Sequence, residues 1–277
     1  MKRLTGNFLA GDALPLFRRA WVPEREPKAT VLLAHGFGEH SGRHGRHAER
    51  LAKRGYAVHA LDLRGHGRSG GPRAYVERFD RYVDDFDDFY QAVRAEASPG
   101  PAFAFGYSMG GLIAALWAID RQPKLAGAIL SAPAVRVGRH VFPVLRRLAG
   151  LVGRWLPRLR LVRLGSRYMS RDSAVADAFR ADPLAFQGRF PARTGAEILR
   201  AGPMVLDRAG ELAVPLLILQ GTGDRVADPR GAEALLAHAG STDKTLLCYE
   251  GLFHELLSEP ERERVLADLA AWLDAHC

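Results

Sequence analysis

The chain has 277 residues, a length typical of one α/β domain that carries an insertion. Hydrophobic residues make up 47% of it and charged residues 25%, which excludes a mainly disordered, collagen-like or low-complexity protein. The 39 Lys and Arg exceed the 31 Asp and Glu, and the net charge of +8 permits nucleic acid, an anionic membrane surface or an acidic substrate as a partner without choosing among them.

The sequence indicates neither a disulfide framework nor a membrane span. The two cysteines, Cys248 and Cys277, are too few for a disulfide-rich domain or a Cys-x-x-Cys metal knuckle, which favours a reducing compartment. Asn7 and Asp12 interrupt the apolar run that a signal peptide needs, and no stretch reaches the roughly 18 apolar residues of a membrane span. We therefore expect a soluble cytoplasmic protein.

The predicted elements begin with a β-hairpin over residues 7–22, folded back at Gly11 and Asp12. After it, short apolar runs bounded by turn residues alternate with segments of helical periodicity. The runs predict buried strands at residues 31–34, 56–63, 102–105, 125–130, 216–219 and 245–249. The periodic segments predict helices at residues 44–54, 79–96, 109–120, 231–239 and 260–275. This alternation indicates an α/β fold with a mostly parallel central sheet and helices on both faces.

The alternation breaks between residues 135 and 207. Five prolines punctuate short helical patterns there: Pro143, Pro157, Pro183, Pro191 and Pro203. We interpret this stretch as a helical cap inserted into a core formed by residues 1–134 and 208–277. Apolar residues at spacings of three and four predict an amphipathic helix within it, at Val141, Val144, Leu145, Leu148, Leu151, Val152 and Trp155.

The first half of this predicted cap is strongly basic. Residues 136–171 contain ten arginines and no acidic residue. One interpretation is a solvated basic face whose side-chain stems cover the main domain. The other is a peripheral contact with lipid headgroups, made by basic charge beside an apolar stripe. Nucleic acid is not an expected partner, because no aromatic-interleaved recognition motif accompanies the charge.

The segment around Ser108 predicts a nucleophile. An apolar strand from Ala102 runs directly into Gly106-Tyr-Ser-Met-Gly110, a G-x-S-x-G sequence, and a helix rich in small residues follows. Such a strand-turn-helix holds the serine in a strained conformation with its hydroxyl exposed, and the two glycines leave room for the neighbouring backbones. A simple structural turn is the alternative.

A nucleophilic serine needs a base, and the base needs an orienting carboxylate. Asp224 lies in the loop after the strand at 216–219, and His254 follows the last predicted strand. The order Ser, Asp, His is the one that α/β-hydrolases use. Asp224 could instead be only a turn former, with Asp228 as the nearest rival, and we interpret Glu255 as a hydrogen-bonding neighbour of the histidine.

Ester hydrolysis also needs donors for the developing oxyanion. We expect one from the backbone amide of Met109, the residue after the nucleophile. The other should come from the glycine-rich loop after the strand at 31–34, where the amide of Phe37 is the best candidate. A plain glycine-rich turn is the alternative for that loop.

Six segments spread over the chain carry recognisable motifs. They are His35-Gly-Phe-Gly-Glu-His-Ser-Gly-Arg, Asp62-Leu-Arg-Gly-His-Gly-Arg-Ser, Gly106-Tyr-Ser-Met-Gly-Gly, Ser131-Ala-Pro, Asp224-Arg-Val and Tyr249-Glu-Gly-Leu-Phe-His-Glu. With them the chain resembles the monoglyceride lipase and lysophospholipase branch of the α/β-hydrolase superfamily over nearly its whole length. Inside the predicted cap, Ser170-Arg-Asp and Asp182-Pro-Leu also resemble this branch.

The resemblance implies Ser108 as nucleophile, Asp224 and His254 as its partners, and Phe37 and Met109 as oxyanion donors. It also implies a lid-like cap over an acyl-chain pocket and no cofactor. The arginine-dense first half of the cap departs from the pattern, since apolar residues would suit a lipid-entry surface better.

Two further patterns suggest other chemistry. Gly65-His-Gly-Arg-Ser-Gly70 fits the dinucleotide fingerprint G-x-G-x-x-G, but Gly71 and Pro72 delay the helix that should begin there. His40, His44 and His47 could suggest a metal site by spacing alone, but no carboxylate or thiolate completes the set.

We therefore predict a serine carboxylic-ester hydrolase that acts through an acyl-enzyme on single-chain lipid esters, namely monoacylglycerols or lysophospholipids. The alternatives are another serine hydrolase on the same scaffold, such as a thioesterase, a C–C bond hydrolase or an aminopeptidase, and a catalytically silent lipid-binding protein. The sequence pattern specifies no oligomeric state.

Overall fold

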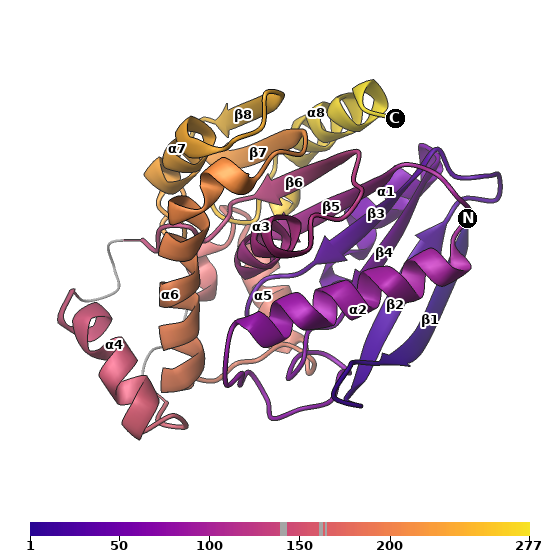
Figure 1. Ribbon diagram of the computed structural model, residues 1–277. Helices are drawn as coiled ribbons and strands as arrows, with labels where there is room; N and C mark the ends of the chain where they lie inside the picture. Colours follow the sequence, from indigo (N-terminus) through magenta and orange to yellow (C-terminus); the bar gives the residue numbers. More distant parts are fainter. Residues whose placement is uncertain (139–142, 161–162, 164) are drawn as a thin grey trace.

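The structure is a computed structural model that describes residues 1–138, 143–160, 163 and 165–277, without the side chains of residues 143–147. Its centre is an eight-stranded sheet with the strand order β1-β2-β4-β3-β5-β6-β7-β8 (Figure 1). The strands are β1 Lys2–Leu9, β2 Pro15–Val22, β3 Ala29–Ala34, β4 Tyr56–Leu61, β5 Ala102–Tyr107, β6 Gly127–Ser131, β7 Leu216–Gly221 and β8 Lys244–Tyr249.

The predicted, mostly parallel sheet is confirmed. All neighbouring strands from β4 through β8 in the sheet order pair in parallel. The predicted hairpin is β1 and β2, although its first strand begins earlier than expected, at Lys2. It belongs to the same sheet, because β2 pairs antiparallel with β4.

Helices cover the two faces of the sheet (Figure 1). Residues of α1 (Gly45–Lys53) and α8 (Arg262–Ala275) pack on one face, whereas α2 (Asp80–Glu96), α3 (Met109–Arg121) and α7 (Pro229–His238) pack on the other. Alternate strand residues therefore enter different cores: Leu216 and Ile218 join the α3 side, and Leu217 and Leu219 join the α8 side. Because both faces are covered, β3, β5, β6 and β7 are buried throughout, as their continuous apolar runs predicted.

The segment between β6 and β7 contains three helices, namely α4 (Pro143–Trp155), α5 (Ser173–Ala181) and α6 (Ala192–Asp207). Short 3₁₀ turns occur at Ser166–Tyr168 and Ala209–Glu211 here, and at Ser41–His44 and Leu256–Ser258 in the rest of the chain. The predicted amphipathic helix corresponds to α4, while Val141 lies outside the described residues.

One predicted helix break is wrong. Pro203 lies inside α6, which runs on to Asp207. An internal proline costs a helix roughly 3 kcal/mol because it removes a backbone hydrogen bond and crowds the preceding turn. Buried Ala201 and Val205 join the main core on either side of it, and we attribute the continuity of the helix to this packing. In the described part of the chain, no helix is long and apolar enough to cross a membrane.

Candidate active site

Three polar side chains meet at the carboxyl edge of the sheet. Ser108 follows β5, Asp224 follows β7 and His254 follows β8. The Nε2 atom of His254 lies 2.8 Å from the Ser108 Oγ, and its Nδ1 atom lies 2.7 Å from the Asp224 Oδ2. All three residues are buried, with exposed fractions of 9% for Ser108, 6% for Asp224 and 1% for His254. The structure thus joins residues separated by up to 146 positions into one hydrogen-bonded chain.

The turn that presents Ser108 is strained. Its φ of 53° and ψ of −114° lie outside the regions that a non-glycine residue ordinarily adopts. The turn is also tight, since a Cβ atom at Gly106 would lie 2.3 Å from the Gly110 carbonyl oxygen, and one at Gly110 would lie 2.1 Å from the Ala34 carbonyl oxygen. The two glycines therefore let α3 begin directly against β3 and β5, as a strand-turn-helix of this type requires.

Asp224 is held by its own loop. Its Oδ1 accepts the backbone amides of Val226 at 2.8 Å and Ala227 at 3.0 Å. Its Oδ2, which faces His254, also accepts a hydrogen bond from the Gln220 side chain at 3.2 Å. The sequence gives no signal for Gln220, because a lone glutamine in a strand belongs to no recognised motif.

Asp228, the alternative to Asp224, has a different position and different partners. Asp228 is the N-cap of α7, where its side chain accepts the backbone amide of Arg230 and forms an ion pair with the Arg230 guanidinium. A carboxylate at an N-cap satisfies backbone donors of the first helical turn. The structure therefore gives the two aspartates different partners, and it is Asp224 that contacts His254.

The loop that carries His254 is anchored by Glu259, which sequence reasoning also missed. This fully buried carboxylate accepts the Phe253 amide at 2.9 Å and the Arg171 amide at 3.1 Å. It also accepts the Arg171 Nε at 2.9 Å. Arg171 belongs to the segment between β6 and β7, so Glu259 ties that segment to the histidine loop. The Glu255 amide, which donates to the Met169 carbonyl oxygen at 2.6 Å, adds a second tie.

The electrostatic surroundings of His254 favour its protonated form. Burial alone would lower its pKa, but the charge of Asp224 and the hydrogen bond to it, followed by the charges of Glu255 and Glu39, outweigh burial and raise the pKa. A histidine whose pKa is raised in this way is a stronger base toward a neighbouring hydroxyl.

The two glutamates belong to a buried polar cluster behind the imidazole. Arg43 lies 3.6 Å from both Glu39 and Glu255, so that Glu255 is an ion-pair partner of Arg43. The His44 Nε2 lies 3.1 Å from the Glu39 Oε1, and the His44 Nδ1 lies 3.0 Å from the His47 Nε2. Burial by itself would raise the pKa of Glu39, but His44 and the neighbouring positive charge outweigh it and hold this pKa below its usual range.

The three histidines whose spacing suggested a metal site make other contacts. His40 turns to Asp182, at 2.8 Å between Nε2 and Oδ2, while His44 and His47 contact each other. Among the residues that the structure describes, no three His, Cys, Asp or Glu side chains converge in a way that could hold a metal ion.

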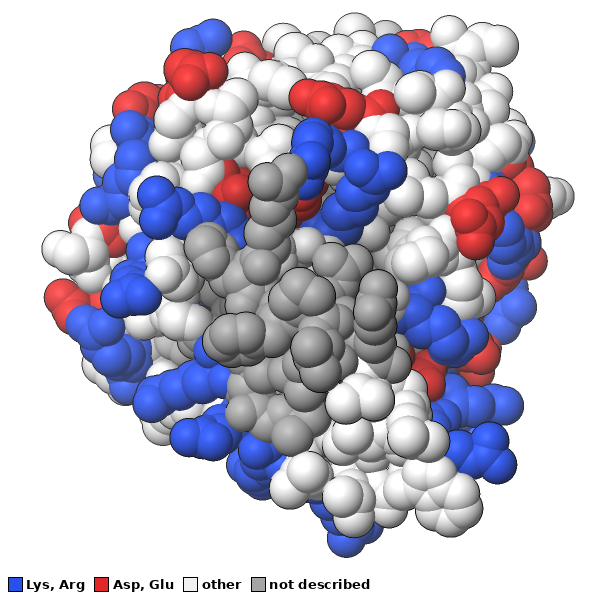
Figure 2. All heavy atoms as spheres, turned by 90° about the vertical axis from the view of Figure 1, so that its left-hand side faces the viewer, with Lys and Arg blue, Asp and Glu red and all other residues white. Residues whose placement is uncertain are grey.

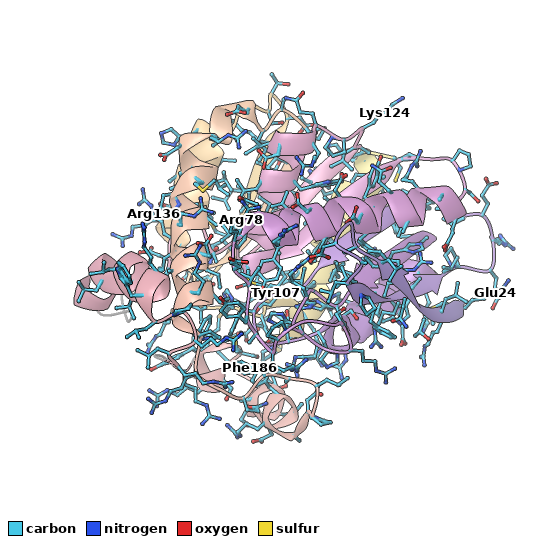
Figure 3. The ribbon with its side chains drawn as sticks, turned by 60° about the horizontal axis from the view of Figure 1, so that its bottom comes forward. Glu24, Arg78, Tyr107, Lys124, Arg136 and Phe186 are labelled. Atoms are coloured by element: carbon cyan, nitrogen blue, oxygen red, sulfur yellow. The ribbon has the colours of Figure 1, made fainter. Side chains whose placement is uncertain are left out.

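The two predicted oxyanion donors come from two segments that meet at Ser108, namely the start of α3 and the loop after β3. Met109 is the first residue of α3, so its amide is among those that a helix N-terminus leaves unpaired. Phe37 lies in the loop after β3, where its ring stacks on Phe190 with 3.8 Å between ring centroids and meets Phe186 edge-on at 6.0 Å. Both of these partners belong to the segment between β6 and β7, and Figure 3 labels Phe186 together with Tyr107 at the end of β5.

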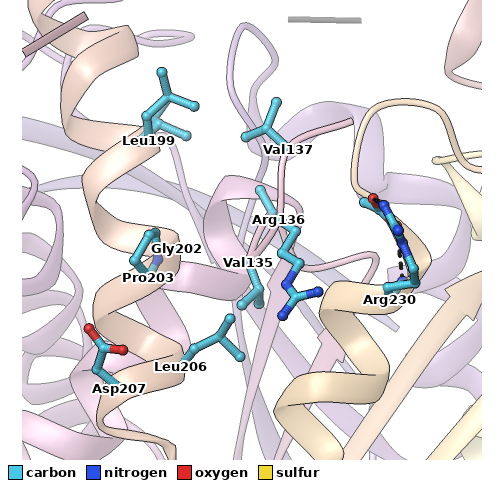
Figure 4. Close-up of a pocket in the computed structure, with 12 residues that line it drawn as sticks. Val135, Arg136, Val137, Leu199, Gly202, Pro203, Leu206, Asp207 and Arg230 are labelled. Atoms are coloured by element: carbon cyan, nitrogen blue, oxygen red, sulfur yellow. Dashed lines mark hydrogen bonds and ion pairs between the residues drawn. The ribbon is translucent and has the colours of Figure 1, made fainter. Parts of the chain in front are cut away.

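A cavity of about 400 Å³ opens between the chain after β6 and helix α6 (Figure 4). One part of its wall is apolar and includes Val135, Leu199 and Leu206. The charged residues Arg136, Asp207, Asp228 and Arg230 also line it. It begins at Ala134, whose amide donates to the Ser108 carbonyl oxygen at 3.1 Å. The cavity therefore borders the segment that is hydrogen-bonded to the serine turn, although neither Ser108 nor His254 lines it.

Comparison with known proteins places the chain in a family. The family model described as "Serine aminopeptidase, S33" matches residues 25–261. The chain belongs to this hydrolase family. It is also 35% identical over 256 residues to a monoacylglycerol lipase of Mycolicibacterium smegmatis, covering 92% of this chain and 91% of that protein. The monoglyceride lipase of Rattus norvegicus is 36% identical over 270 residues, or 96% of this chain and 89% of that protein.

Solved structures agree with this placement. The crystal structure of the monoacylglycerol lipase of Paleococcus ferrophilus superposes with a TM-score of 0.84 at 28% identity and covers 100% of both chains. The α/β-hydrolase fold and the resemblance to the monoglyceride lipase branch are thereby confirmed. The hydrolase is a serine ester hydrolase of this branch, and a silent binding protein is not favoured.

Proposed function

We propose that this hydrolase cleaves the ester bond of monoacylglycerols through an acyl-enzyme, with Ser108 as nucleophile, His254 as general base and Asp224 as its orienting acid. The observation that carries the proposal is the hydrogen-bonded chain of these three side chains. The Ser108 Oγ attacks the ester carbonyl carbon while the His254 Nε2 takes the hydroxyl proton, and Asp224 stabilises the imidazolium. The imidazolium then gives that proton to the departing glycerol oxygen.

Water then hydrolyses the acyl-enzyme, and His254 again acts first as a base and then as an acid. His254 accepts a proton from the water as its oxygen attacks the acyl carbon, and returns that proton to the Ser108 Oγ as the fatty acid leaves. In both tetrahedral intermediates, the backbone amides of Phe37 and Met109 hold the negative oxygen. Loss of one such donor typically lowers kcat by about a hundredfold or more.

We propose that the cavity between residues 134–137 and helix α6 receives a single acyl chain. We assign it to this role because Val135, Leu199 and Leu206 offer an apolar wall and Ala134 joins it to the nucleophile turn. We further propose that residues 135–207 act as a cap, since Phe186 and Phe190 of that segment lie on the Phe37 ring at the other side of the site. The relatives named for monoacylglycerol favour this substrate over a lysophospholipid.

A substrate panel tests the proposal. Purified enzyme is assayed with monoacylglycerols, lysophospholipids, short p-nitrophenyl esters, thioesters and peptides, and is labelled with a fluorophosphonate probe. We expect labelling and turnover of monoacylglycerols, both lost in Ser108→Ala without a change in the melting temperature. Retained turnover in Ser108→Ala overturns the nucleophile assignment, and a preference for peptides or thioesters overturns the substrate class.

The second proposal concerns helix α4, which we propose touches lipid surfaces. Its inward face is small: Ala149 and Gly153 are buried, and a Cβ atom at Gly153 would lie 2.9 Å from the Ala196 Cβ of α6. Its outward face is large and apolar, with Leu151 58% and Trp155 70% exposed. Basic side chains surround this side of the molecule (Figure 2). Exposed apolar residues beside arginines are the combination that binds an anionic bilayer surface.

A flotation assay tests the contact. The protein is mixed with vesicles of phosphatidylcholine containing phosphatidylserine and spun through a density gradient, in parallel with vesicles of phosphatidylcholine alone. We expect co-flotation with the anionic vesicles that weakens as salt is added, because salt screens the arginines. Absence of salt-sensitive flotation removes this proposal and leaves the ester hydrolase proposal untouched.

A further inference from the structure

The backbone at Gly36 is held by two side chains that the reaction scheme above does not use: Glu39 binds its amide, which belongs to the His35–Gly36 peptide, and His35 binds its carbonyl, which belongs to the Gly36–Phe37 peptide. The Gly36 amide donates to the Glu39 Oε1 at 2.6 Å. The Gly36 carbonyl oxygen lies 2.6 Å from the Nδ1 of His35. Both contacts are buried, so water does not compete for them.

The contact made by the other ring nitrogen of His35 shows that Nδ1 is the donor in the bond to Gly36. The backbone amide of Leu63 donates to the His35 Nε2 at 3.0 Å, which makes Nε2 an acceptor. A neutral imidazole has one donor and one acceptor, so its proton is on Nδ1 and is donated to Gly36. Burial of the ring lowers the pKa of His35 to about 4, so the ring stays neutral above about pH 5.

The Gly36 carbonyl and the Phe37 amide belong to the same trans peptide. In a trans peptide the C=O and N–H groups point in opposite directions within one plane. A bond that fixes the carbonyl therefore fixes the direction of the Phe37 N–H as well. Within the described part of the chain, that N–H has no hydrogen-bond partner of its own.

This peptide lies directly beside the nucleophile. A Cβ atom placed on Gly36 would lie 3.2 Å from the Ser108 Cβ and 3.2 Å from the Glu39 Oε1. When Ser108 attacks the ester, the carbonyl oxygen of the substrate becomes the oxyanion, and it forms close to the Gly36–Phe37 peptide. A shift of about 1 Å in a group of this kind can cost a hundredfold in rate.

We propose that His35 is a positioning residue for hydrolysis: its Nδ1–H bond to the Gly36 carbonyl sets the plane of the Gly36–Phe37 peptide and so aims the Phe37 N–H at the oxyanion. The inference rests on the proposed function, in which Phe37 supplies one oxyanion donor. The same bond polarises the peptide and strengthens its N–H as a donor. His35 touches no substrate and acts only through this peptide.

A purely structural role is the competing explanation. His35 is fully buried, satisfies the Leu63 amide and packs edge-on against His66 at 5.4 Å between ring centroids. Two variants separate the explanations. His35→Asn places an amide nitrogen near the Nδ1 position and keeps the donor to Gly36, whereas His35→Gln reaches the Nε2 position and keeps the acceptor for Leu63.

The experiment compares both variants with the wild-type enzyme, using steady-state kinetics on a p-nitrophenyl ester, inhibition by a trifluoromethyl ketone and thermal unfolding. We expect His35→Asn to keep kcat within about fivefold of the wild type. His35→Gln should lose about 10- to 100-fold in kcat with little change in KM, and bind the ketone more weakly by a similar factor, because the ketone adduct carries an oxyanion. Equal kcat losses in the two variants, or none in either, overturn the inference.

A measurement on the wild-type protein covers the case in which a variant does not fold. ¹⁵N-edited NMR of histidine-labelled enzyme reports which ring nitrogen of His35 carries the proton. We expect the proton on Nδ1, and a downfield shift of its resonance when the ketone adduct forms. A proton on Nε2, or a resonance that the adduct leaves unchanged, overturns the inference. Failure of the proposed function looks different, since the wild-type enzyme itself would then show no esterase activity and no labelling of Ser108.

Discussion

The carboxyl edge of the sheet and helix α4 are built in opposite ways. At the sheet edge, each member of the Ser108, Asp224 and His254 group follows a strand and is at most 9% exposed. On α4, Leu151 and Trp155 are 58% and 70% exposed, although both are apolar. Buried side chains with fixed partners can provide the geometry that acyl transfer needs, and largely exposed apolar side chains can provide a surface for a lipid aggregate.

The difference comes from which residues face the neighbouring element. At the sheet edge, backbone amides and buried side chains such as Gln220 and Glu259 hold the loops from several directions. On α4, the small residues Ala149 and Gly153 are buried toward α6 and leave the bulky side chains outside. If the proposed roles hold, the chemistry depends on the core, whereas access of substrate depends on the segment between β6 and β7.

The largest expected effect of a conservative substitution is at Asp224. Asp224→Asn keeps the shape but supplies an amide where the His254 Nδ1–H needs an acceptor, so the imidazole adopts the wrong tautomer and kcat falls by about 10⁴-fold. Stopped-flow or initial-rate assays with a p-nitrophenyl ester measure it. The matched control is Asp228→Asn, which makes the same change of side chain and keeps an equally good N-cap on α7, so kcat should stay within about threefold. Equal loss of kcat in both variants would contradict the division of roles between the two aspartates.

The second-largest expected effect is a difference in stability between variants in the core and variants on α4. Phe86 of α2 is fully buried and meets Trp117 edge-on at 5.0 Å between ring centroids. Phe86→Ala should lower the free energy of unfolding by about 3–5 kcal/mol, because it removes buried apolar surface and leaves a cavity. Trp155→Ala should change it by less than about 0.5 kcal/mol, since little of this ring is covered. Guanidinium unfolding curves of both variants measure the contrast, and similar losses would show that α4 is packed as tightly as the core.

Most of the sheet and the three clustered residues could be predicted from the sequence, and for a physical reason. Central parallel strands are buried on both faces and read as continuous apolar runs. Ser108 and Asp224 each follow such a strand. His254 follows β8, which the sequence also predicts to be buried but which is half-buried for most of its length because it lies at the edge of the sheet. The carboxyl ends of parallel strands lie at one edge of a sheet. Their convergence thus followed from local patterns alone.

The supporting residues and the inserted segment could not be predicted in this way. Gln220 and Glu259 act through single long-range contacts, and a residue that bonds a distant loop leaves no periodic signal. The continuation of α6 through Pro203 depends on packing that outweighs a local preference. The periodicity of α4 predicted a helix, but an apolar stripe alone does not indicate whether protein or lipid covers it.

The third prediction concerns the exposed face of α4. The double variant Leu151→Ser, Trp155→Ser removes two large apolar side chains without touching the Ser108 site, and should weaken partition onto anionic vesicles by about tenfold or more. Turnover of a short, fully dissolved ester should stay within about twofold, while kcat/KM for vesicle-borne monoacylglycerol falls with the partition. Flotation measures the partition onto vesicles, and assays with the dissolved ester and with vesicle-borne monoacylglycerol measure the difference in turnover. An equal loss on both substrates would mean that α4 shapes the site itself.

The smallest expected effect is a shift in the pH profile. His254 must be neutral to act as a base, so activity is lost as pH falls through its pKa, which Asp224, Glu255 and Glu39 together raise. Glu255→Gln keeps the shape but removes one negative charge, and with it part of the stabilisation of the imidazolium, although the Arg43 ion pair with Glu39 persists.

The acid limb of kcat/KM in Glu255→Gln should therefore move to lower pH, while the plateau at higher pH stays within about threefold of the wild type. Rates measured from pH 4.5 to 9 give the shift. Glu263→Gln is the control, because Glu263 lies on the exposed side of α8 and pairs with Arg50 at the surface. A limb that stays in place in the Glu255 variant would show that Asp224 alone sets the basicity of the imidazole, and that the buried charges behind the sheet edge serve the fold and not the proton transfer.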